Sequence, residues 1–256
     1  MRNNLVRVIG VLLWKHGQIV QTEKFHVTNV IHDNPIHAIE AFDASDLDEL
    51  ALINISKDSS LNQNFSEEVY KLTRKLRIPL VAGGGIRNLD DCNRLLRAGA
   101  DKLILNSLIF EDLSTTENLL KSLGASTFVA SLDFMYLKNN SELRYLYNHQ
   151  NQTKTKFSLN EVLQKIQKVG FGEIFFNNVL HDGSRIGYDT CGLKQIANLC
   201  NIPIVAFGGV ANWNHLIEGI EAGADAVAFG NALHYVEMAP KLAKLHLLNN
   251  GYKIRT

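Results

Sequence analysis

Cysteine and net charge are both scarce in this sequence. The three cysteines, Cys92, Cys191 and Cys200, are odd in number and form no CxxC pair, which argues against a disulfide framework and a zinc site. Lys plus Arg and Asp plus Glu each number 26, so the chain has no charge excess that would favour nucleic acid or an anionic membrane. We therefore expect buried or helix-surface thiols, no metal, no cofactor and no nucleic-acid partner.

Long apolar runs are also absent. No run approaches the roughly 20 residues that a membrane span needs, and the opening MRNNLVRVIGVLLW is too short and too interrupted for a secretion signal. We expect a cytoplasmic protein without a membrane partner, in which residues 1–256 form a single domain. The first apolar run ends in Leu12, Leu13 and Trp14, so no group that can move a proton stands at its carboxyl end.

Short runs rich in Val, Ile, Leu and Phe alternate along the chain with stretches of helical period, such as 64–77 and 88–100. This alternation is typical of a (β/α)8 barrel, although an open doubly wound sheet shares it. The polar stretch 138–158 is long for a connection and predicts a hairpin over the mouth. The predicted strands are residues 6–13, 49–55, 78–82, 102–106, 127–133, 173–177, 202–206 and 226–230.

An internal repeat distinguishes the two architectures. The stretch IPLVAGGGIRNLDDCNRLLRAGADKLILNS begins at Ile78 and aligns without a gap with IPIVAFGGVANWNHLIEGIEAGADAVAFGN, which begins at Ile202. The offset of 124 residues is close to half of the 256-residue chain. We therefore predict an α/β fold, a (β/α)8 TIM barrel built from two duplicated (β/α)4 half-barrels, because an open sheet gives no reason for such an offset.

Each copy of the repeat carries glycines directly after a strand and a small polar turn one strand later. The glycines are Gly83–Gly85 and Gly208–Gly209, and the turns are Asn106–Ser107 and Gly230–Asn231. Glycine lets backbone amides approach an anion closely, so each copy resembles a phosphate cradle, with simple tight turns as the alternative. Two facing cradles predict a phosphorylated small molecule with a phosphate at each end.

Three segments are similar to the cyclase subunit of imidazole glycerol phosphate synthase: VAGGGIRNLDDCNRLLRAGADKLILNS, LDF at 132–134 and NNVLHDGSRIGYD at 177–189. In that family the barrel binds a bisphosphate nucleotide intermediate, takes ammonia from a partner glutaminase and closes an imidazole ring. The resemblance implies that Asp133 is catalytic. By position it implies the phosphate ligands Gly85, Asn106 and Ser107 on one side and Asp182, Gly183, Gly209, Gly230 and Asn231 on the other.

The sequence departs from this family where the chemistry takes place. The family pairs two aspartates for acid and base steps, and the strand 1 aspartate is Leu13 here. The strand 2 aspartate is Asn54. At the opposite face the family admits ammonia through a ring of charged side chains, and that ring is retained as Arg7, Glu49, Lys102 and Glu173. We interpret these four as an ammonia gate, with independent solvated charges as the alternative.

The segment LLWKHGQIVQTEKF, residues 12–25, resembles paralogous cyclase-like barrels associated with acetamidino-sugar formation in surface polysaccharides. Our first hypothesis is therefore a barrel that passes on ammonia from a glutaminase bound at the amino-terminal face, with a sugar amidotransferase as a further candidate partner. One alternative is an authentic cyclase that makes imidazole glycerol phosphate in histidine biosynthesis. Another is a non-catalytic scaffold or an isomerase relative.

Overall fold

The computed structural model describes residues 5–41, 44–56, 58, 62–137, 140–149 and 152–255. Eight parallel strands of this part of the chain close into a barrel, since β10 pairs with β7 as well as with β11. The predicted (β/α)8 architecture is confirmed. In sheet order the strands are β1 (Arg7–Lys15), β4 (Glu49–Asn54), β5 (Leu80–Gly83), β6 (Lys102–Leu105), β7 (Phe128–Leu137), β10 (Glu173–Asn178), β11 (Ile204–Phe207) and β12 (Ala226–Phe229).

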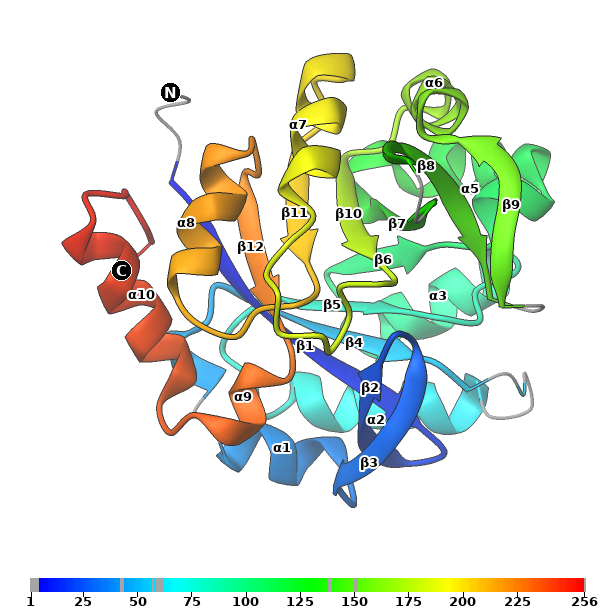
Figure 1. The fold of residues 1–256 in the computed structure, drawn as a ribbon. Coiled ribbons are helices and arrows are strands. Elements are labelled where there is room, and N and C mark those ends of the chain that lie inside the picture. The colour runs from blue at the N-terminus through cyan, green and yellow to red at the C-terminus, as the bar shows by residue number, and fades with distance from the viewer. Residues whose placement is uncertain are drawn as a thin grey trace.

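Helices surround the barrel strands (Figure 1). None of the helices in the described ranges is long and apolar enough to span a membrane. The helices are α1 (Pro35–Ala41), α2 (Asn62–Thr73), α3 (Leu89–Arg97), α4 (Leu108–Glu111), α5 (Leu113–Leu123), α6 (Leu159–Val169), α7 (Thr190–Leu199), α8 (Asn214–Glu221), α9 (Ala232–Tyr235) and α10 (Ala239–Asn249), with 3-10 turns η1 (Ala44–Asp46) and η3 (Ala125–Thr127).

Local side chains set where several of these helices begin. Ser158 caps α6, and Glu161 reaches back to the Ser158 backbone to complete a capping box. The Asn88 side chain accepts from the Asp91 amide at the start of α3. The Asp189 side chain accepts from the Gly192 amide at the start of α7. Each cap satisfies an amide that the first helical turn leaves without a partner.

The strands alternate between an inner and an outer apolar face. On β1, Ile9 and Val11 lie inside the barrel, whereas Val8 and Leu12 pack against the helices. Both faces are apolar because the strands are buried on both sides. The barrel interior is filled by Ile9, Val11, Ala51, Val81, Ile104, Val129, Phe175, Val205, Ala226 and Ala228.

The repeat seen in the sequence recurs in the structure at the same spacing. β5 and β11 begin at Leu80 and Ile204, and α4 and α9 begin 124 residues apart as well. Gly84 and Gly208 both have a φ of 95°. The two halves thus share backbone geometry as well as sequence, as a duplicated half-barrel predicts.

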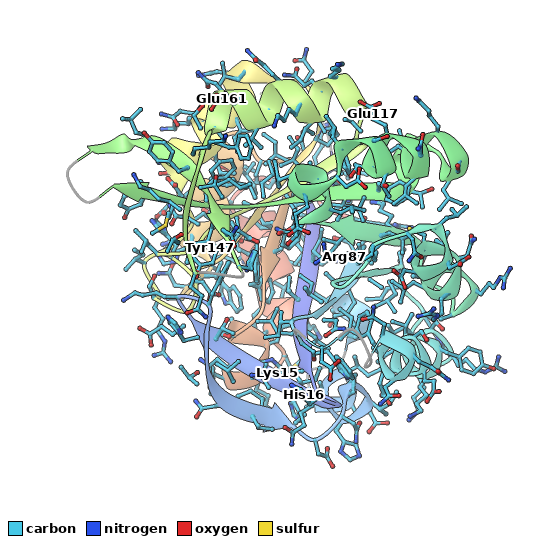
Figure 2. The ribbon with its side chains drawn as sticks, turned by 90° about the vertical axis from the view of Figure 1, so that its right-hand side faces the viewer. Lys15, His16, Arg87, Glu117, Tyr147 and Glu161 are labelled. Atoms are coloured by element: carbon cyan, nitrogen blue, oxygen red, sulfur yellow. The ribbon has the colours of Figure 1, made fainter. Side chains whose placement is uncertain are left out.

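Two antiparallel additions extend from the barrel. The lid hairpin, β2 (Gln18–Glu23) and β3 (His26–His32), follows β1 and was not predicted from the sequence. The second hairpin, β8 (Asn140–Asn148) and β9 (Thr153–Ser158), follows β7 and agrees with the predicted hairpin, although 138–139 and 150–151 lie outside the described residues. Figure 2 shows Tyr147 on β8, facing the lid hairpin.

The β8–β9 hairpin is anchored by a buried ion pair. Arg144 of β8 is 3% exposed, and its Nε and Nη2 donate to Asp189 at 2.7 and 2.5 Å. Asn178 Nδ2 donates to the same carboxylate at 2.7 Å. Because a buried charge needs full pairing, these contacts fix the hairpin against the carboxyl end of β10 and the start of α7.

Candidate active site

The carboxyl ends of the barrel strands form a mouth that is apolar on one side and polar on the other. Leu13 lies on the inner face of β1, and Leu13, Ile53 and Phe207 each pack against the apolar barrel interior. The polar side lies on the neighbouring strands β6, β7 and β10, and consists of Asn106, Asp133 and Asn177. Leu13 thus lies at an inner mouth position, which agrees with the prediction that it replaces the strand 1 aspartate of the resembled family. Asn54 follows the inward-facing Ile53 on β4, so it does not lie on the inner face of the barrel.

Asp133 is the carboxylate of this polar side, and its side chain is 11% exposed. Asn106 Nδ2 donates to Asp133 Oδ2 at 2.8 Å, and His149 Nε2 lies 2.8 Å from the same oxygen. Burial and the nearby Asp133 charge raise the pKa of Tyr147. A buried carboxylate that contacts an amide and an imidazole through one oxygen, with the other oxygen left for a ligand, can serve in proton transfer.

The second phosphate cradle borders a cavity of about 280 Å³. Gly209 has a φ of 84°, and an added Cβ would lie 2.3 Å from the Gly187 carbonyl oxygen, so only glycine fits there. Arg185 supplies a cationic side chain to the lining, whereas burial lowers the pKa of His234 to about 4 and keeps it neutral. The cavity brings together the five predicted phosphate ligands of this side, Asp182, Gly183, Gly209, Gly230 and Asn231.

Asp182 uses its carboxylate to hold the lid hairpin. Its Oδ2 accepts from the Thr22 hydroxyl at 2.8 Å and from the Phe25 amide at 3.0 Å, and its carbonyl accepts from the Lys24 amide. Burial raises the pKa of Asp182 to about 6. An ionised carboxylate cannot donate to a phosphate, so the contacts observed for Asp182 tie the lid down, and its role as a phosphate ligand stays a prediction.

The first phosphate cradle, at Gly85, Asn106 and Ser107, has much less open space than the second. The cavity beside Gly85 measures only about 10 Å³, and Asn62 Nδ2 donates to the Gly85 carbonyl at 3.1 Å. Asn106 turns to Asp133, and the Ser107 hydroxyl lies 3.5 Å from the Asn106 amide oxygen. The predicted ligands Gly85, Asn106 and Ser107 follow the adjacent strands β5 and β6, and a phosphate there would need side chains to move.

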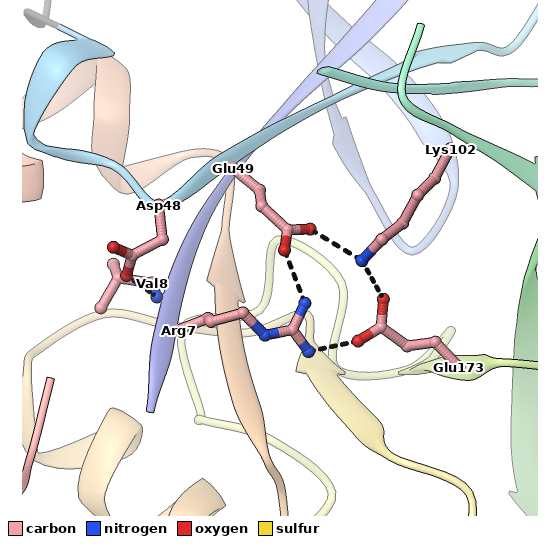
Figure 3. A network of polar contacts seen from close by, with 6 residues as sticks. All are labelled: Arg7, Val8, Asp48, Glu49, Lys102 and Glu173. Atoms are coloured by element: carbon pink, nitrogen blue, oxygen red, sulfur yellow. Dashed lines mark hydrogen bonds and ion pairs between the residues drawn. The ribbon is translucent and has the colours of Figure 1, made fainter. Parts of the chain in front are cut away.

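At the amino-terminal end of the barrel, the four predicted gate residues form a closed ring of ion pairs (Figure 3). Arg7 contacts Glu49 at 2.7 Å and also contacts Glu173, while Lys102 lies 3.5 Å from Glu49 and 3.2 Å from Glu173. Burial alone would lower the pKa of Arg7, but its bonds to Glu173 and Glu49 outweigh burial and raise it. The charges alternate in sign and pair with one another rather than with solvent, and their role as an ammonia gate stays a prediction.

The comparisons with known proteins cover nearly the whole chain. The family model described as "Histidine biosynthesis protein" matches residues 7–239. The chain belongs to this histidine biosynthesis family. It is 32% identical over 246 residues to the imidazole glycerol phosphate synthase subunit HisF of Exiguobacterium sp., covering 94% of each chain. It is 26% identical over 249 residues to HisF of Pyrococcus furiosus, covering 97% of this chain and 98% of the relative.

Several residues near the mouth of this histidine biosynthesis family member were not predicted from the sequence. Thr22 and Phe25 of the lid and His149 after β8 all reach the mouth, yet their positions depend on how two hairpins fold back. Only the predicted hairpin at 138–158 hinted that a group such as His149 could lie there. No three His, Cys, Asp or Glu side chains in the described ranges are grouped to hold a metal ion.

Proposed function

We propose that this protein is the ring-closing subunit of a glutamine-dependent pair and makes imidazole glycerol phosphate from a bisphosphate nucleotide intermediate. One arrangement carries this proposal: Asp133 lies on the inner face of the mouth, with glycine cradles on the strands to either side and the ring of ion pairs at the opposite end. The names of the HisF relatives support the same reaction.

The cradles bind the two phosphates of the ligand. On the open side, the Gly209 and Gly230 backbone approaches one phosphate and Arg185 neutralises its charge. On the other side, Gly85 and Ser107 bind the second phosphate after Asn62 moves away from the Gly85 carbonyl. A ligand that is held at both ends has its middle over Asp133. The binding energy of the two phosphates is thus used to orient the reacting carbon.

Ammonia enters at the other end of the barrel. A glutaminase docked on the amino-terminal face releases neutral ammonia at the ring of Arg7, Glu49, Lys102 and Glu173. When the ring opens, the apolar interior above it, which includes Ile9, Val129 and Phe175, admits a small neutral molecule more readily than an ion. The ion pairs thus exclude ammonium and water from the barrel between deliveries.

One observation favours a second candidate function. Leu13 gives the mouth an apolar side where a second carboxylate would divide the proton transfers with Asp133. A barrel with a single mouth carboxylate fits delivery of ammonia to a separate sugar amidotransferase for acetamidino-sugar synthesis. Both functions share the glutaminase and the ring of ion pairs.

The experiment that separates them combines the purified protein with a histidine-pathway glutaminase, glutamine and the bisphosphate nucleotide intermediate, and detects imidazole glycerol phosphate by mass spectrometry. We expect product formation that Asp133→Asn abolishes. Ammonia release without product would favour the second function, and a glutaminase that the barrel neither binds nor stimulates would contradict both. Complementation of a histidine auxotroph checks the first function in cells.

A further inference from the structure

His149 lies in the mouth although it does not belong to a barrel strand. It follows β8, and its Nε2 is 2.8 Å from Asp133 Oδ2. The imidazole is 37% exposed, whereas the Asp133 side chain is 11% exposed. One ring nitrogen therefore faces the buried carboxylate, and no bond from Nδ1 to another described residue is present.

The inner mouth positions offer few other groups that can move a proton. Besides Asp133, the inner side chains at this level are two amides and three apolar groups, which are Asn106, Asn177, Leu13, Ile53 and Phe207. Asp182 is turned to the lid hairpin. We propose that His149 and Asp133 form a proton-transfer pair, in which His149 takes the place of a second carboxylate. This inference rests on the proposed ammonia-using reaction and names a further residue for it.

The geometry assigns a role to each atom of the pair. Because an ionised carboxylate only accepts, Asp133 holds His149 with a proton on Nε2, which leaves Nδ1 as a base. When neutral ammonia forms a bond to a ligand carbon, the new nitrogen carries a positive charge and must lose one proton. Nδ1 takes that proton, Asp133 stabilises the resulting imidazolium, and His149 passes the proton to the ligand oxygen that received the electron pair of the C=O bond. A second proton then moves by the same route from the nitrogen to this oxygen, so that the C–O bond breaks, water leaves and a neutral C=N bond remains.

Aromatic contacts fix the imidazole in this orientation. Phe25 of the lid hairpin stacks on His149 with ring centroids 5.3 Å apart and planes 13° from parallel. Tyr147 meets the same ring edge-on at 5.2 Å. Asp182 holds Phe25 through its amide, and Arg144 anchors β8. The imidazole is thus placed by two hairpins that are both tied to the barrel.

The kinetic test supplies the bisphosphate nucleotide intermediate with ammonium salt, so that no glutaminase is needed. For His149→Gln we expect kcat to fall by about a hundredfold with a smaller change in KM, since general acid–base catalysis contributes about that much. Added imidazole should restore part of the rate of His149→Ala. A kcat within about threefold of the wild type would overturn the inference.

A matched control uses a second histidine–carboxylate pair within the described part of the chain. His37 Nδ1 lies 2.6 Å from Asp33, but both side chains are more than half exposed on α1 and its preceding turn. His37→Gln should leave kcat unchanged. This result would show that the fall in kcat comes from the pair in the mouth and not from the loss of a histidine–carboxylate pair in general.

A second measurement needs no turnover. The ¹⁵N shifts of the His149 ring should report a proton on Nε2 in the wild type and a mixture of tautomers in Asp133→Asn. If the wild type itself makes no product, the proposed function fails, but this measurement still shows whether Asp133 sets the tautomer of His149. A His149 ring whose tautomer is the same in both proteins would overturn it, while a change of tautomer supports it.

Discussion

At the residue scale, Leu13 is the side chain that stands where a mouth with two carboxylates would have the second one. It packs against the apolar barrel interior and is only partly buried, so a carboxylate placed there can reach both water and ligand. We expect Leu13→Asp to raise the rate of ring closure at least about tenfold, because a second acid is added. The cost is about 1–3 kcal/mol of stability for the lost packing.

Steady-state kinetics with ammonium salt and urea unfolding measure the two effects of Leu13→Asp. Ile53→Asp is the control, since it adds a carboxylate to the inner face of the adjacent strand. No gain in kcat/KM from Leu13→Asp, or an equal gain from both variants, would contradict the prediction.

Also at the residue scale, Asp182 links stability to pH. Its folded pKa is raised from 3.8 to about 6, mainly by burial, so the folded state holds a proton that the unfolded state has already released. Stability from this group is therefore complete below pH 3.8 and is lost as pH rises through about 6. We expect about 3 kcal/mol of wild-type stability to be lost over this range relative to Asp182→Asn.

Urea midpoints of the wild type and Asp182→Asn between pH 4 and 7 check this prediction. Asp33→Asn is the control, because Asp33 is exposed and makes its contacts at the surface. Stability curves of the wild type and Asp182→Asn that run parallel across this range would show that Asp182 does not carry the effect.

At the scale of elements, the loop after β11 depends on a close approach of backbone to side chain. Gly208 has a φ of 95°, and an added Cβ would lie 2.1 Å from Asn177 Oδ1. Gly124 has a similar φ of 86°, but nothing lies within 4 Å of its added Cβ. We expect Gly208→Ala to cost about 1–3 kcal/mol more than Gly124→Ala, because only the former adds a collision to the backbone strain.

Thermal or urea unfolding of Gly208→Ala and Gly124→Ala measures this difference directly. Binding of inorganic phosphate, followed by calorimetry, should weaken in Gly208→Ala alone, because its loop borders the larger cavity. Equal stability losses would mean that the loop after β11 relaxes away from Asn177 without cost.

At the scale of the whole molecule, the ring of ion pairs lies at the amino-terminal end of the barrel, opposite the mouth. Lys102→Met leaves Glu49 and Glu173 paired only with Arg7, so the ring loses the balance of charge that keeps it ordered. We expect glutamine-driven turnover to fall by about tenfold, with turnover on ammonium salt preserved. The ratio of the two rates is the measurement.

Lys244→Met is the matched control for the ring. Lys244 pairs with Asp48 at 2.8 Å, and Asp48 immediately precedes Glu49 but takes no part in the ring (Figure 3). Its removal costs stability without changing the ratio of the two rates. Equal falls with glutamine and with ammonium salt for Lys102→Met would mean that the ring does not conduct ammonia.

The barrel strands were predictable from local period, and the repeat from a gapless alignment at an offset of 124 residues. The position of Leu13 was implied by the family resemblance and agrees with the alternation along β1. Apolar runs set the strands, and alternation along β1 sets which side chains face inward. The lid hairpin was not predicted, since residues 18–32 carry no strong turn signal and the hairpin is held by contacts with Asp182, far along the chain. The full contact set of Asp133 was missed for the same reason.

The sequence by itself determined the eightfold alternation, the duplicated halves and the set of charges at the strand starts, because residue order alone carries them. The tertiary structure decided that Arg7, Glu49, Lys102 and Glu173 pair in one closed ring and that His149 meets Asp133. Those contacts join residues from different strands and hairpins, and only barrel closure and hairpin packing bring them within bonding distance.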